Sequence, residues 1–139
     1  MRPIAVLDSS VVVSGIGWSG GDARSVLVLL AQRAFVSVRT PWLTAEWAEV
    51  TERVSQEVRW ANRNWANWLE WLKRASLLVD ERPTRRIVRD VKDDPVLATA
   101  LSGGAQYLVA YDQDLLDLGK PYGVACLTPR AFLGAVLRG

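Results

Sequence analysis

Residues 3–8 read PIAVLD, a short apolar run that ends in an acidic residue. A few consecutive apolar residues bounded by turn residues are typical of a strand that is buried on both faces of a sheet. Comparable runs recur at residues 35–38, 76–79, 106–110 and 123–127. Because helical patterns separate these runs, the sequence predicts an α/β fold with a central, mostly parallel sheet of about five strands.

The helical segments are recognised by their apolar spacing and by the residues at which they begin. Asp22, Thr40 and Thr128 are suitable N-caps, and proline follows Thr40, Asp94 and Thr128 at the first helical position. Helices are predicted at residues 23–33, from 41 onward, at about 60–74, at 95–102, as a short turn at 112–118, and at 129–137. Residues 9–21 are predicted to be turn-rich, and residues 81–92 to form a loop or a short helix.

The composition removes several classes of chemistry. The chain has 139 residues, half of them hydrophobic, which fits one domain spanning residues 1–139. It has no histidine and a single cysteine, Cys126, which excludes His-dependent nucleophilic catalysis, His-ligated zinc and an intramolecular disulfide. We therefore expect a reducing, cytoplasmic location. No apolar stretch is long enough for a membrane span, and the net charge of +2 permits a polyanionic partner.

Three acidic residues lie where strands end or helices begin. Asp8 directly follows the first predicted strand, Asp112 lies two residues after the fourth, and Asp94 precedes a helix. In open α/β sheets, ligands bind beyond the carboxyl ends of the strands. The structural alternatives are an Asx-turn for Asp8 and N-caps for Asp94 and Asp112, and Asp114 on the following turn either joins the site or faces solvent. The dipole of its helix should also keep Asp94 ionised.

Glu46 is placed unusually for a surface acid. It lies three residues after Leu43 and four before Val50, both of which belong to the apolar stripe of the predicted helix. It therefore sits on the border of the buried face, whereas Glu49 and Glu52 are explained as solvated charges.

Asp8, Glu46, Asp94 and Asp112 come from four separate segments and can converge on one site. Carboxylates gathered in one place repel each other and are held together by cations. Oxygen ligands without histidine or cysteine point to Mg²⁺ or Mn²⁺. The chemistry that fits is metal-assisted attack of water on a phosphodiester.

Four segments of the chain resemble, in the same order, the motifs of PIN-domain ribonucleases. Residues 6–14, VLDSSVVVS, resemble the opening motif, and residues 89–101, RDVKDDPVLATAL, resemble the third. Residues 103–116 resemble the fourth motif, and residues 127–133 the closing strand-to-helix segment. The resemblance is strongest to the branch of VapC-like toxins of toxin–antitoxin systems, and it implies a three-layer α/β/α fold.

The resemblance also implies roles for individual residues. Asp8, Glu46, Asp94 and Asp112 would be the catalytic, metal-binding acids, with Asp114 as an additional ligand. Ser9 or Ser10 would orient a carboxylate or a metal-bound water, and Asp93 would be auxiliary. Asp90 and Asp93 leave the register of the third motif ambiguous. The resemblance implies an Mg²⁺- or Mn²⁺-dependent endoribonuclease with an RNA substrate and a cognate antitoxin.

This sequence departs from the family pattern at two positions. Relatives often have asparagine where this chain has Ser10, and serine or threonine where it has Ala110. Loss of that second hydroxyl would weaken the support of a metal ligand. The alternative function is a non-catalytic PIN-like module that binds RNA or a protein.

Three further features have more than one interpretation. The arginines Arg82, Arg85, Arg86 and Arg89 would hold phosphates flanking the cleaved bond, hold an acidic antitoxin segment, or form a solvated basic face. Six of the seven tryptophans lie between residues 42 and 71, where they form core or a partner surface such as a homodimer face or a groove for an antitoxin helix. Residues 15–20, GIGWSG, match a dinucleotide-binding glycine pattern, but they begin too far after the strand, so a flexible loop is the better interpretation.

Overall fold

The computed structural model describes residues 1–81 and 94–139. Within these residues five strands form one sheet in the order β3-β2-β1-β4-β5, and every neighbouring pair is parallel. The strands are β1 (Ile4–Leu7), β2 (Val36–Arg39), β3 (Leu77–Leu78), β4 (Tyr107–Val109) and β5 (Ala125–Leu127). This confirms the predicted α/β class and the central parallel sheet.

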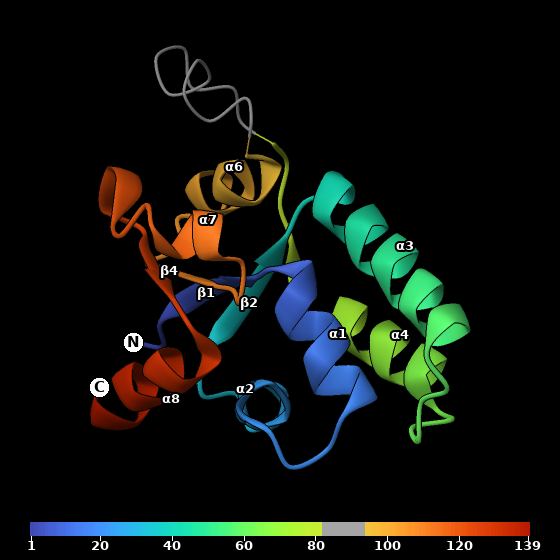
Figure 1. Ribbon diagram of the computed structural model, residues 1–139. Coiled ribbons are helices and arrows are strands. Elements are labelled where there is room, and N and C mark those ends of the chain that lie inside the picture. Colours follow the sequence, from blue (N-terminus) through green and yellow to red (C-terminus); the bar gives the residue numbers. More distant parts are fainter. Residues whose placement is uncertain (82–93) are drawn as a thin grey trace.

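Helices cover both faces of the sheet, so the fold is a three-layer α/β/α arrangement (Figure 1). Right-handed crossovers place the helices that connect β1, β2 and β3 on one face and those that lead to β4 and β5 on the other. α6 packs on β1, β2 and β4, whereas α8 packs on β4, β5 and α2. The helices are α1 (Ser9–Gly17), α2 (Asp22–Ala31), α3 (Pro41–Glu57), α4 (Trp65–Ala75), α6 (Pro95–Ser102), α7 (Gln113–Leu116) and α8 (Pro129–Arg138), with a short 3₁₀ turn at Pro121–Gly123.

The prediction of a turn-rich segment at residues 9–21 is wrong over most of its length, because α1 occupies residues 9–17. Valine, serine and glycine are poor helix formers, but Asp8 caps this helix, and Val11, Val12 and Ile16 are completely buried. Burial of that apolar face outweighs the low intrinsic propensity.

The glycines of α1 allow close helix packing. A Cβ atom added to Gly15 would lie 2.7 Å from Leu27 Cδ1 of α2, and one added to Gly17 would lie 2.8 Å from Trp60 Cε2. Both contacts are shorter than real side chains tolerate. The dinucleotide-loop and flexible-loop interpretations of these two glycines are therefore wrong, because they are buried helical residues.

Several predicted boundaries also move. α2 begins one residue earlier than predicted, with Gly21 rather than Asp22 at the N-cap. α4 begins at Trp65, so Trp60 lies in the connection before it, where it is only 8% exposed. The caps predicted at Thr40, Asp94, Asp112 and Thr128 are all present, each accepting a backbone hydrogen bond. No helix in the described part of the chain is long and apolar enough to cross a membrane.

Candidate functional site

Asp8 and Asp112 follow the carboxyl ends of β1 and β4, the two strands between which the strand order of the sheet reverses. β1 is the central strand, and the chain runs from it to β2 on one side and later to β4 on the other. Such a switch point opens a crevice at the carboxyl ends of the two strands. The Asp8 N–H donates a 2.9 Å hydrogen bond to the carbonyl oxygen of Val109, which fixes the end of β1 against the end of β4. Asp112 lies three residues after Val109, the last residue of β4.

A cavity of about 690 Å³ brings four of the predicted site residues together. Asp8, Asp94, Asp112 and Asp114 all line it. The rest of its wall is mostly apolar and consists of Val96, Leu97, Leu115, Leu118, Pro121 and Tyr122. The sequence contained no signal for Leu118, Pro121 and Tyr122, because the connection from α7 to β5 has no periodic pattern.

Three of these carboxylates are also helix N-caps. Asp8 accepts from the Ser10 N–H at 3.3 Å, Asp112 accepts from the Asp114 N–H at 3.0 Å, and Asp94 accepts from two backbone N–H groups at 3.2 Å. The interpretation of these acids as capping residues is therefore correct for all three, but it does not exclude a functional role. These bonds use one oxygen of each carboxylate, Oδ2 of Asp8 and Oδ1 of Asp94 and Asp112, so capping holds the group in place while its other oxygen can serve as a ligand.

The electrostatics of the cavity favour a cation. Burial raises the pKa of the Asp94 carboxyl above its ordinary value of 3.8, and the charges of Asp8 and Asp112 raise it further. Hydrogen bonds from Leu97 and Val96 act in the opposite direction. Desolvation therefore opposes the charged form of Asp94 more strongly than the hydrogen bonds at the helix N-terminus favour it, and the ionised state of Asp94 stays a prediction.

The negative charge of Asp94 also affects the buried thiol of Cys126. Its pKa is raised first by burial and then by the charge of Asp94. No arginine or lysine of the described residues lines the cavity. A cluster of carboxylates without a cationic side chain is stabilised when a cation binds.

The two serines after Asp8 differ in their contacts. The Ser10 hydroxyl donates to Asp8 Oδ2 at 2.6 Å and accepts from the Tyr111 N–H at 3.1 Å, so it connects the acid after β1 with the segment after β4. Ser9 Oγ is buried and has no partner in the described part of the chain. A buried hydroxyl without a partner is costly unless a water or a ligand satisfies it.

Glu46 lies on α3 and is half-buried, as its place beside the apolar stripe predicts. It does not line the cavity. The next residue, Trp47, donates from Nε1 to the carbonyl oxygen of Leu7, the residue before Asp8, at 2.9 Å. Glu46 therefore lies one residue away from a side chain anchored at the end of β1, and its role as a ligand stays a prediction.

The donor set fits a hard divalent ion together with its waters. In the described ranges no three acidic or cysteine side chains are close enough to hold an ion between them as they stand. Mg²⁺, however, keeps several waters and takes only one or two carboxylates directly. Carboxylates spaced around a roomy cavity fit an ion bound in that way.

Several predicted site residues, and most of the loop or short helix predicted at residues 81–92, belong to a segment that the structure does not describe. Asp93 and the arginines Arg82, Arg85, Arg86 and Arg89 lie outside the described residues, as does Asp90. Trp47 is completely buried in the core, and Trp65, Trp68 and Trp71 of α4 are half-buried and pack against it, while the partner surface stays a prediction.

This architecture and this sequence are similar to those of known proteins. A search of the curated proteins found no match. Among solved structures, the chain is similar to that described as "Crystal structure of PAE2754 from Pyrobaculum aerophilum", with a TM-score of 0.66 and 14% sequence identity over 99% of this chain and 91% of the other. At that identity the likeness concerns the fold. Residues 4–114 match the PIN domain family, whose members are generally metal-dependent nucleases. Because that match covers most of the sequence, this chain belongs to the PIN domain family.

Proposed function

We propose that this protein is an endoribonuclease that depends on Mg²⁺ or Mn²⁺ and hydrolyses RNA phosphodiester bonds. The observation that carries the proposal is the placement of Asp8, Asp94 and Asp112 around one cavity at the switch point of the sheet. Asp114 on the same wall is a further ligand candidate, and Glu46 on α3 completes the proposed set.

The residues of the chain prepare the site in three ways. Helix capping and the Ser10 hydroxyl hold the carboxylates in fixed orientations, which lowers the cost of organising ligands. Val96, Leu97 and Leu115 form an apolar wall beside the carboxylates, which strengthens electrostatic interactions near it. A divalent ion held by these acids would supply a water of lowered pKa and neutralise charge on the phosphate. Attack of that water at phosphorus would leave a 5′-phosphate and a 3′-hydroxyl.

The decisive experiment compares an acid that lines the cavity with an exposed acid that does not. Asp8→Asn removes a charge from the cavity and keeps the cap, because asparagine caps helices as well as aspartate. Asp117→Asn removes an exposed charge that lies outside the cavity. Defined RNAs are incubated with Mn²⁺ or Mg²⁺ and with a chelator. We expect cleavage by the parent and by Asp117→Asn with metal, and none by Asp8→Asn or with chelator. Equal cleavage by Asp8→Asn and the parent would falsify the mechanism.

The same pair of variants tests a toxin role with a cognate antitoxin in the cytoplasm. The family resemblance supports this role, and the arginines at residues 82–89 are candidates for contacts with RNA or with an acidic antitoxin segment. Expression of the parent should slow growth of a bacterial host, whereas Asp8→Asn should not. Growth inhibition by both proteins would indicate that toxicity does not depend on hydrolysis.

The alternative is a non-catalytic PIN-like module that binds RNA or a protein, including a second copy of this chain. It predicts RNA or protein binding that is unchanged in Asp8→Asn, with no cleavage by any form of the protein.

A further inference from the structure

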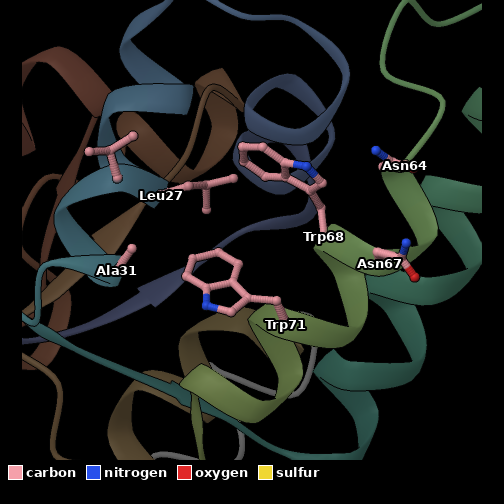
Figure 2. A pocket seen from close by; sticks show the side chains of 7 residues that line it. Leu27, Ala31, Asn64, Asn67, Trp68 and Trp71 are labelled. Atoms are coloured by element: carbon pink, nitrogen blue, oxygen red, sulfur yellow. The ribbon is translucent and has the colours of Figure 1, made fainter.

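A second cavity lies between α2 and α4, away from the carboxylates. It has a volume of about 330 Å³ and is lined by Leu27, Val28, Ala31, Asn64, Asn67, Trp68 and Trp71. Figure 2 shows Trp68 and Trp71 projecting from α4 toward Leu27 and Ala31 of α2, with Asn64 and Asn67 at the N-terminal end of α4. This pocket has two indole walls, an aliphatic wall and amide groups at its border.

The ring of Trp68 is held in place from within the protein. The Arg24 guanidinium lies 4.1 Å from the centroid of the Trp68 ring, and Arg24 itself donates to the carbonyl oxygens of Gly15 and Ile16. Trp68 and Trp71 meet edge to face, with centroids 6.4 Å apart. The aromatic walls are therefore preorganised, which reduces the entropy lost when a ligand binds.

A basic cavity of about 520 Å³ adjoins the aromatic pocket. Ala31 and Trp71 line both, so the two cavities lie next to each other, and together they are called the groove. Arg2, Arg33 and Arg74 line the basic part, and all three are exposed. No acidic side chain of the described residues lines either part. The groove thus joins an aromatic pocket to a site with three guanidinium groups and no opposing charge.

We propose that this groove, defined by the lining residues of the two cavities, binds single-stranded RNA outside the active site. One base would occupy the pocket and pack against the indoles, with its polar edge toward Asn64 and Asn67, and the adjoining phosphates would contact the arginines. Stacking on aromatic rings combined with a positively charged path for the backbone is how proteins hold single strands, and arginine suits bidentate contacts with phosphate. The proposal rests on RNA being the substrate.

The charge of the groove and its shape favour RNA over a peptide helix. A helix docked in a groove uses apolar anchors over successive turns, but here the apolar residues of the second cavity share its lining with Arg2, Arg33 and Arg74. No residue of the groove lines the carboxylate cavity. Arg2 and Val36 line the basic part, and they lie near the N-terminal ends of β1 and β2. The carboxylates, in contrast, follow the C-terminal ends of β1 and β4. RNA in the groove is therefore held at the opposite edge of the sheet from the cleaved bond.

The test measures binding separately from cleavage. A fluorescein-labelled oligouridylate of about twelve nucleotides, within the usual site size of single-strand binding folds, is titrated in chelator while anisotropy is recorded. Val28→Glu places a charge in the pocket at a side chain that is 45% exposed, and Leu137→Glu is its matched control on α8, at a side chain that is 75% exposed. We expect Val28→Glu to weaken binding at least about fivefold, the lower limit for loss of one stacked base, and Leu137→Glu to bind as the parent does.

The arginines are tested through the salt dependence of binding. Arg33→Gln combined with Arg74→Gln should reduce the slope of log affinity against log salt by about 1.4, because each phosphate contact with a single strand contributes about 0.7. The control is Arg130→Gln combined with Arg138→Gln, which removes two exposed arginines of α8. An equal reduction in the control pair would show that only net charge matters and would overturn the proposal.

The outcomes separate this inference from the proposed function. Cleavage by the parent with unchanged RNA binding in Val28→Glu overturns the groove and leaves the nuclease intact. Groove-dependent binding by a parent that never cleaves RNA supports the groove and overturns the nuclease. Absence of RNA binding by the parent, or binding of an acidic amphipathic peptide that is lost in Val28→Glu, shows that RNA is not the occupant.

Discussion

The Ser10 hydroxyl donates a 2.6 Å hydrogen bond to Oδ2 of Asp8. The same hydroxyl accepts from the backbone N–H of Tyr111, so a single side chain connects the proposed ligand after β1 with the segment that leads to Asp112 after β4. Residues that orient a metal ligand in this way affect metal affinity and activity without touching the metal.

Ser10→Ala should therefore reduce cleavage by about 10- to 100-fold and weaken Mn²⁺ binding, since the loss of such support costs that much in other metal sites. Ser14→Ala, one helical turn further along α1, is the matched control and should change neither. Ser10→Asn should retain much of the activity, because its amide can both donate to Asp8 and accept from Tyr111. Activity and Mn²⁺ affinity of Ser10→Ala equal to those of the parent would show that this hydrogen bond is unimportant.

Glu46 can be tested against a neighbour that differs mainly in position. Saturation with Mn²⁺ at about 100 times the dissociation constant should stabilise the parent by about 2.7 kcal/mol. Glu46→Gln should reduce this stabilisation in thermal unfolding. Glu49→Gln should not, since Glu49 is exposed and pairs with Arg53 at 3.1 Å. An identical Mn²⁺ response in Glu46→Gln and the parent would remove Glu46 from the ligand set.

Asp94 should make the metal-free protein less stable as pH rises. Its pKa is raised in the folded state, so between pH 3.8 and that raised pKa the folded protein binds more protons than the unfolded chain. Its contribution to stability therefore falls through this window and stays low above it. Asp94→Asn keeps a good N-cap and should be more stable than the parent in chelator at neutral pH, with the difference vanishing below pH 3.8.

Urea unfolding across pH checks this expectation, and Mn²⁺ should reverse the order of the two proteins because only the parent retains the full ligand charge. A parent that is more stable than Asp94→Asn in chelator at neutral pH would contradict the prediction.

Gly15→Ala should destabilise the protein although alanine favours helices. The new Cβ would meet Leu27 Cδ1 at 2.7 Å and the carbonyl oxygen of Ala23 at 3.0 Å. Overpacking of this kind costs about 1–3 kcal/mol. The control is Gly134→Ala in α8, where the nearest atom lies at 3.7 Å on the flexible side chain of Arg138. That substitution should stabilise by up to about 1 kcal/mol. Denaturant unfolding measures both, and stabilisation by Gly15→Ala would show that α1 and α2 are not closely packed.

Much of the fold was predictable because its signals are local. Apolar runs predicted every strand of the sheet, and the caps at Thr40, Asp94 and Thr128 were recognisable from residue type and spacing. α1 could not be predicted in this way, because valine, serine and glycine do not favour helices, and burial of Val11, Val12 and Ile16 outweighs that low propensity.

For the candidate site, the sequence by itself determined which residue types were available and where along the chain each acid lay. Without histidine or a second cysteine, only oxygen chemistry remained. The tertiary structure decided which acids meet, because the order β2-β1-β4 places the residues after Leu7 and Val109 side by side although they are far apart in sequence. The raised pKa of Asp94 and the groove between α2 and α4 were likewise decided by packing, since desolvation and surface shape depend on neighbours distant along the chain.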